Sequence, residues 1–153
     1  MRLILAFLAV LMPGLAHAAN NVALNSEVFV ERLIKDEAGR PKTVLEMPKV
    51  VVPGDRLVFV LNYRNVGVAP ANDFVVTNPL PDAVQFQGTA DPVAQVSVDG
   101  GQNWGALTAL KIRENDGNWR SASPEDVTHV RWAVKQAIPV GAKGSLSFRG
   151  IVR

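Results

Sequence analysis

The chain has 153 residues, of which 48% are hydrophobic and 20% are charged, and its formal net charge is +2 at pH 7. This balance is that of a globular protein, so it excludes a wholly disordered chain, and the charge is too small to indicate a nucleic-acid partner. The sequence contains no Cys, which excludes disulfides, thiol catalysis and Cys-ligated metal or iron–sulfur centres.

The first 18 residues have the features of a cleaved signal peptide. Arg2 supplies a positive charge, and an apolar run from Leu3 to Met12 follows it. The run is shorter than the ~20 residues that a membrane span requires, so the alternative of an N-terminal anchor is disfavoured. Ala16 and Ala18 are the small residues that signal peptidase recognises. We therefore expect export to the bacterial periplasm or beyond it, as a single domain of residues 19–153 with no membrane span.

The exported part has an apolar pattern with a period of two almost throughout, and no apolar stripe of helical period reaches helical length. Glu114–Asp126 is expected to be a polar loop. This pattern predicts an all-β, antiparallel sandwich or barrel of about seven to nine short strands. The apolar segments from which those strands are drawn are Ser26–Ile34, Thr43–Met47, Lys49–Val52, Leu57–Val66, Asp73–Thr77, Ala83–Gln87, Val93–Val98, Leu107–Arg113, Thr128–Val134 and Gly144–Arg153.

Several motifs also follow one another in a characteristic order: Val52–Asp55, Leu61–Gly67, Phe74–Pro81, Val130–Trp132 and Pro139–Phe148. Their order resembles that of the bacterial conserved repeat domain family, also called domain of unknown function 11, over about 100 residues. The resemblance implies an immunoglobulin-like β-sandwich and an exported location, and it implies no reaction. Family members often occur as tandem repeats, whereas one copy is present here, and Asn78 stands where the family usually has Asp. Gly67 is expected to end its strand with a positive φ.

Residues 97–104, Ser-Val-Asp-Gly-Gly-Gln-Asn-Trp, resemble the Asp-box hairpin of sialidase propellers. The expected roles are local: Ser97 begins the hairpin, Asp99 accepts backbone N–H groups across the turn, Gly101 takes a positive φ, and Trp104 packs over the hairpin. A propeller needs several four-stranded blades, which a chain of this length cannot supply. The motif is therefore interpreted as a structural hairpin, and no glycosidase activity is predicted.

Trp119 is the best candidate for a ligand contact, because the sequence assigns it no packing partner. The alternative is that it folds back on the sheet. His129 is expected at a strand surface, because neither a catalytic partner nor a second His accompanies it. No catalytic, cofactor-binding or metal-ligating residue is predicted. A weak Ca²⁺ site built from Glu114, Asp116 and Asp126 is a lesser alternative to solvated turn carboxylates.

These observations predict a non-enzymatic interaction or structural module of the cell envelope, with an envelope or surface protein as its partner and no cofactor. The alternative is a small carbohydrate-binding domain that uses Trp119, with or without Trp104. In an immunoglobulin-like topology the last strand is often internal, so Thr43–Met47 and Asp73–Thr77 are the expected free edges. We expect docking near Asp73–Thr77.

Overall fold

The computed structural model describes residues 21–153, so the predicted signal peptide, with Ala16 and Ala18, lies outside the described residues. These residues form an all-β structure that contains short 3₁₀ helices and no α-helix. No helix that could cross a membrane occurs among them. The strands are β1 (Val22–Lys35), β2 (Pro41–Glu46), β3 (Arg56–Asn65), β4 (Phe74–Pro79), β5 (Val84–Gly88), β6 (Ala94–Ser97), β7 (Lys111–Arg113), β8 (Trp119–Ser121), β9 (His129–Val134) and β10 (Lys143–Val152); the 3₁₀ helices are η1 (Leu107–Ala109) and η2 (Pro124–Asp126).

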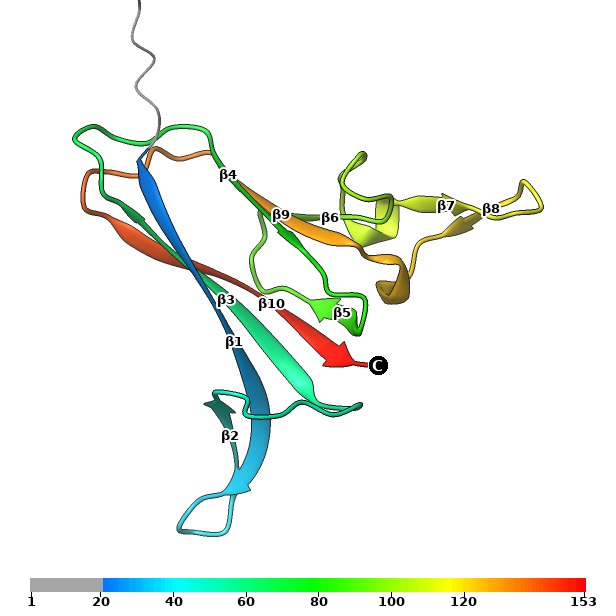
Figure 1. Ribbon diagram of the computed structural model, residues 1–153, viewed down its shortest axis with the longest axis horizontal. Helices are drawn as coiled ribbons and strands as arrows, with labels where there is room; N and C mark the ends of the chain where they lie inside the picture. The colour runs from blue at the N-terminus through cyan, green and yellow to red at the C-terminus, as the bar shows by residue number, and fades with distance from the viewer. Residues whose placement is uncertain (1–20) are drawn as a thin grey trace, which may run out of the picture.

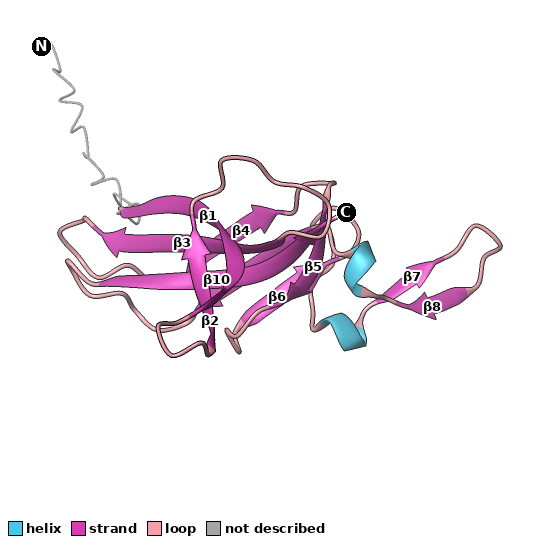
Figure 2. Cartoon of the chain, turned by 90° about the horizontal axis from the view of Figure 1, so that it is seen from below, coloured by secondary structure: helices cyan, strands magenta, loops and turns pink. Residues whose placement is uncertain are grey.

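The strands form two antiparallel sheets and one outlying hairpin (Figure 1). The larger sheet has the order β2-β1-β3-β10-β5, and the smaller sheet has the order β4-β9-β6. The hairpin of β7 and β8 projects away from both sheets (Figure 2). The last strand, β10, lies between β3 and β5, while β2 and β4 are edge strands. This arrangement is consistent with an antiparallel β-sandwich.

Side chains from both sheets meet in one apolar core. Trp132 of β9 and Phe148 of β10 are almost completely buried, and their ring centres lie 6.1 Å apart. Phe148 also stacks on Phe59 of β3 at 4.5 Å. The alternation in the sequence explains this packing, because successive side chains of a strand point to opposite faces. Leu146 and Phe148 are buried in this way, whereas Ser145 and Arg149 remain exposed.

Asn65, at the end of β3, joins three segments through its buried amide. Its Nδ2 donates to the carbonyls of Ala69 at 2.9 Å and Ile138 at 2.8 Å, and its Oδ1 accepts the N–H of Gly67. Gly67 does not have the positive φ that the sequence predicts. A side chain there would crowd the Asn65 amide and Asn21, each at 3.2 Å from an added Cβ. The close approach of Asn21 and of the Asn65 amide therefore explains why residue 67 is a glycine.

Three other segments differ from the pattern expected from the sequence. Lys49–Val52 is not a strand, because Asp55 draws Val52 into a turn: the N–H of Val52 donates to Asp55 Oδ2 at 3.0 Å, and the N–H of Asp55 donates to the carbonyl of Val52. The segment Leu107–Arg113 divides into η1 and β7, and the predicted polar loop contains β8. Gly117, at φ 88°, closes the tight turn between β7 and β8.

Candidate functional site

The Asp-box residues form a tight hairpin around one carboxylate. Asp99 Oδ1 accepts the Ser97 hydroxyl at 2.7 Å and the N–H groups of Gln102 and Asn103 at 3.1 and 2.9 Å. Asp99 Oδ2 accepts the Asn103 amide at 2.7 Å. These donors, the Asn103 N–H first, lower the pKa of Asp99 to about 2, because each of them stabilises the charged form. Gly101 takes a positive φ of 90°. The carboxylate is thus occupied by its own turn.

Trp104 packs over this hairpin and is already covered by a cation. The guanidinium carbon of Arg131 lies 4.3 Å from the centre of the Trp104 ring, a cation–π contact. The His129 ring meets the same indole edge-on at 6.3 Å, and its Nδ1 lies 3.0 Å from the Thr128 hydroxyl. Arg131 also donates to Gln95 at 2.7 Å. Trp104 therefore belongs to the packing between hairpin and sheet, which leaves this indole less open to a ligand than Trp119.

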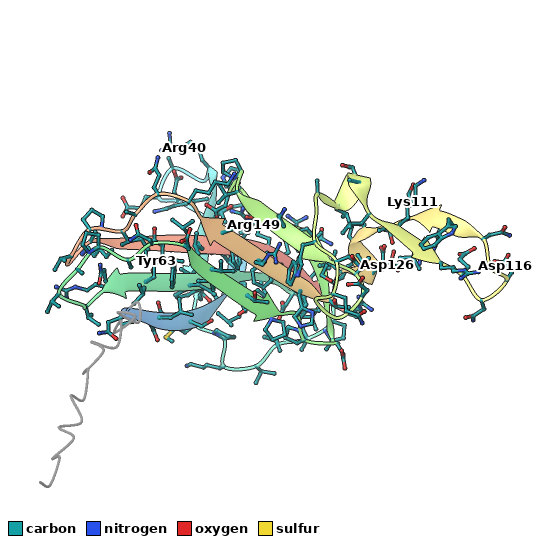
Figure 3. The ribbon with its side chains drawn as sticks, turned by 90° about the horizontal axis from the view of Figure 1, so that it is seen from above. Arg40, Tyr63, Lys111, Asp116, Asp126 and Arg149 are labelled. Atoms are coloured by element: carbon teal, nitrogen blue, oxygen red, sulfur yellow. The ribbon has the colours of Figure 1, made fainter. Side chains whose placement is uncertain are left out.

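Arg120 fastens the projecting hairpin to the rest of the chain. Its two terminal nitrogens donate to the two carboxylate oxygens of Asp126 at 2.6 and 2.7 Å, and its Nε lies 3.2 Å from Glu114. The bidentate pair holds the pKa of Asp126 well below its ordinary value. Asp126 also accepts the N–H and hydroxyl of Ser123 at the start of η2. Figure 3 labels Asp126 near the base of this hairpin and Asp116 near its tip.

The three carboxylates considered for Ca²⁺ are occupied by protein groups. Glu114 and Asp126 both pair with Arg120, and Asp116 accepts the N–H and amide of Asn118 at 2.9 and 2.8 Å. The turn bonds from Asn118 lower the pKa of Asp116. No group of acidic or His residues spaced to hold a metal ion occurs within residues 21–153.

A hollow of about 590 Å³ lies between the Asp99 hairpin and the projecting hairpin, and we call it the Trp119 groove. Trp119 does not fold back on the sheet: 64% of its surface is exposed. Arg113 is its direct cross-strand neighbour, and Lys111 lies on the same face of the hairpin. The residues that line the groove are Val98, Asp99, Asn103, Ala109, Leu110, Lys111, Ile112, Arg113 and Trp119.

The sequence pattern indicates Trp119 as a ligand contact but does not indicate the two cations beside it. Their proximity depends on the register of β7 against β8, which the turn around Asp116 and Gly117 sets. An Asp-Gly pair between two short apolar segments is a hairpin signal. That signal was present in the predicted polar loop, but a two-residue turn at Asp116 and Gly117 would have paired Trp119 with Glu114. The loop of residues 115–117 that the structure forms pairs Trp119 with Arg113 instead.

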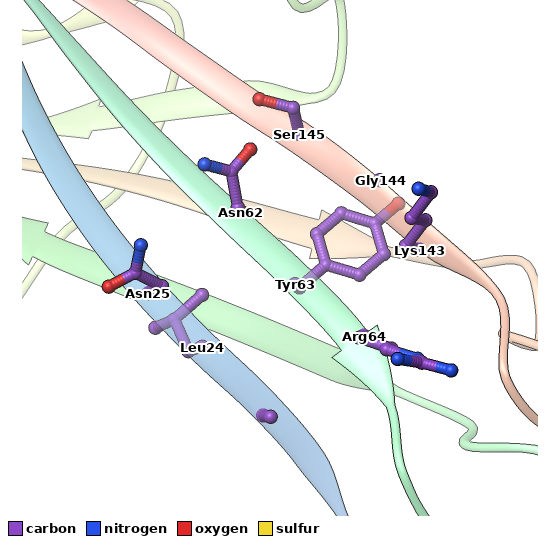
Figure 4. A pocket seen from close by; sticks show the side chains of 9 residues that line it. Leu24, Asn25, Asn62, Tyr63, Arg64, Lys143, Gly144 and Ser145 are labelled. Carbon is purple, nitrogen blue, oxygen red and sulfur yellow. The ribbon is translucent and has the colours of Figure 1, made fainter.

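A second hollow, of about 680 Å³, lies where β1, β3 and β10 run together (Figure 4). Arg64 of β3 pairs with Lys143 of β10, and the next pair in this ladder is Tyr63 with Gly144. The Tyr63 side chain lies so close over Gly144 that an added Cβ would collide with its phenol group. This glycine therefore has a packing role beneath an aromatic ring.

The β4 edge is the other candidate site, and it consists of backbone groups. The N–H of Leu80 donates to the carbonyl of Thr128 at 2.8 Å, in continuation of the pairing between β4 and β9. Hydrogen-bonded pairs alternate with non-hydrogen-bonded pairs in an antiparallel ladder. Val76 therefore bonds to Trp132, whereas the N–H and C=O groups of Val75 and Thr77 point away from β9. We call Val75 and Thr77 the β4 edge; both side chains are exposed.

Comparisons of this chain with protein families, with curated proteins and with solved structures found no match.

Proposed function

We propose that this chain is a non-enzymatic, exported module of the bacterial cell envelope, with the immunoglobulin-like fold implied by its resemblance to the conserved repeat domain family. In this proposal, an extended segment of an envelope or surface protein adds to the β4 edge as a further strand. Main-chain hydrogen bonds supply affinity in this mode of recognition, and alternate side chains supply specificity.

The observation that carries the proposal is the register of β4. The ladder with β9 leaves the backbone groups of Val75 and Thr77 directed outward. An edge of this kind is either protected or used as a template for pairing. The exposed fraction of the Val75 side chain is 53%, and this apolar side chain offers a partner a contact of the kind that strand addition requires.

The test is in-cell photo-crosslinking from a photoreactive residue placed at Thr77. We expect a crosslink to a discrete envelope protein, and we expect Val75→Pro to abolish it, because proline removes an outward N–H. Val75→Thr keeps this N–H and should keep the crosslink. Cooperative thermal unfolding of the wild type and both variants would show that the fold is retained. A crosslink that survives Val75→Pro in a folded protein would contradict docking at this edge, and substrate turnover by the purified domain would contradict the non-enzymatic role.

A second candidate function is carbohydrate binding at the Trp119 groove. It is favoured by the exposure of Trp119 beside a hollow that also contains amide and charged groups. An indole with an open face offers an apolar platform on which the C–H bonds of a sugar ring pack. Specific binding on a glycan array that Trp119→Ala abolishes would support this candidate. Binding that Trp119→Ala leaves unchanged would exclude the groove.

A further inference from the structure

The positive charge at the Trp119 groove is concentrated on one face. Lys111 and Arg113 are two residues apart on β7, so their side chains leave the strand on the same side as Trp119. Neither cation forms an ion pair with any described residue. Both residues are exposed (Figure 3 labels Lys111). The groove thus presents two cations without an ion-pair partner next to an aromatic ring.

The groove also contains one carboxylate, Asp99, which forms no ion pair with either cation and leaves the groove with a net positive charge. Asp99 is ionised at neutral pH, but its oxygens accept four hydrogen bonds from its own hairpin. The other nearby carboxylates, Glu114 and Asp126, are held by Arg120. Arg120 alternates with Arg113 and Trp119 in the ladder, so it leaves the hairpin on the opposite side.

The face of Trp119 is also available. Within residues 21–153, the indole that is covered by a guanidinium is that of Trp104, and the guanidinium belongs to Arg131. Arg113 is close to Trp119 in the ladder but does not cover its ring. A ligand could therefore stack on the Trp119 indole and place an anionic group beside Arg113, whose guanidinium binds carboxylate and phosphate groups in a bidentate manner.

We propose that the Trp119 groove binds an acidic saccharide, one that carries carboxylate or phosphate groups. The sugar ring stacks on Trp119, its anionic group lies between Lys111 and Arg113, and residues such as Val98 and Leu110 line the rest of the groove. This inference rests on the carbohydrate-binding candidate above, and it adds the charge class of the ligand. It is independent of docking at the β4 edge.

The test compares charged sugars with their neutral counterparts by isothermal titration at low salt. The probes are tetragalacturonate with its methyl ester, and a phosphorylated mannose oligomer with its dephosphorylated form. We expect one charged probe to bind at least about tenfold more tightly than its neutral counterpart, and we expect this preference to shrink as salt increases. Trp119→Ala should remove binding, and Trp119→Phe should restore part of it.

The matched charge control uses the exposed pair Arg64 and Lys143, which lies in the hollow of Figure 4, formed by β1, β3 and β10. Lys111→Gln/Arg113→Gln should abolish the preference for the acidic probe, while Arg64→Gln/Lys143→Gln should leave it intact. If both double variants weaken binding equally, the effect is one of net charge and the proposed site is wrong. Equal binding of charged and neutral probes at Trp119 overturns the acidic class alone. Binding of no probe also overturns the acidic class, and an empty glycan array beside it would show that the carbohydrate candidate fails as well.

Discussion

The two edges of the three-stranded sheet differ in whether their outward backbone groups are hydrogen-bonded. At β6, the N–H of Val96 donates to the carbonyl of Gly105 at 2.9 Å, and the N–H of Gly105 returns a bond of 3.1 Å to the carbonyl of Val96. The hairpin around Asp99 brings Gly105 back to this position. At β4, the outward groups of Val75 and Thr77 face away from the sheet. One edge is closed by its own chain and the other is open.

This difference indicates where the sheet has room for another strand. An unpaired edge invites pairing with another chain, and proteins usually block such edges with turns, charges or proline. Pro79, which ends β4, removes one outward donor but leaves those of Val75 and Thr77. This contrast supports the proposed docking at β4, whereas the Asp99 hairpin closes its own edge. Each of the following substitutions tests one side of the contrast.

The largest effect is expected from Val76→Pro. Val76 is buried, and its N–H bonds to the carbonyl of Trp132. Proline would leave that buried carbonyl unpaired and remove packed apolar surface, so we expect a loss of roughly 3–5 kcal/mol in the free energy of unfolding. Val75→Pro, one residue away, should cost less than about 1 kcal/mol. Urea unfolding of both variants provides the measurement; equal losses would show that β4 is not an edge.

The long strands could be predicted from the sequence because each carries several alternations. β3 and β10 show this clearly: Phe59, Leu61, Leu146 and Phe148 repeat at every second position and are buried. Three-residue strands such as β7 and β8 offer a single alternation, which does not distinguish a strand from a loop. Their existence depends on the turn at Gly117 and on contacts made by Arg120, which is six residues away from Asp126.

The candidate site, like the strands, could be predicted only where its sequence pattern is local. The Asp-box pattern is local, so Ser97, Asp99 and Gly101 could be assigned to one turn from their spacing. The exposure of Trp119 was not predictable, because it results from a hairpin that the Arg120–Asp126 pair holds away from the sheet. The open β4 edge also required the structure, since the order of strands in a sheet is a property of the whole topology.

A smaller, local effect is expected from Asp99→Ala. It removes the acceptor of four hydrogen bonds within the hairpin, so the hairpin should release Gly105 from β6. We expect the amide hydrogens of Val96 and Gly105 to exchange roughly tenfold faster, with little change at β4. Asp116→Ala is the control, because Asp116 ties a turn that does not border β6. Unchanged exchange at Val96 would show that the carboxylate does not close this edge.

Arg131→Met should have a still smaller effect. The substitution keeps an apolar stem but removes the cation over Trp104 and the hydrogen bond to Gln95. We expect a loss of about 1 kcal/mol in the free energy of unfolding, with the largest change in the environment of Trp104. Urea unfolding followed by Trp fluorescence measures both. A loss as large as that of Val76→Pro would mean that Arg131 supports the fold itself.

The last and most local effect is the pH dependence that Asp99 contributes at the closed edge. The hydrogen bonds of its turn lower the pKa of Asp99 from 3.8 to about 2, so the folded chain binds this proton less readily than the unfolded chain does. The stabilisation is therefore complete above pH ~4 and is lost as the pH falls through ~2. Asp126 is also held ionised by Arg120, so the projecting hairpin should remain fastened through most of this range. NMR signals of the Asn103 amide should titrate with a midpoint near 2, and Asp99→Asn should eliminate that titration. If the midpoint in the folded protein lies near the ordinary pKa of Asp, the hairpin does not hold the Asp99 carboxylate in solution. The contrast between the two edges would then lose its physical basis.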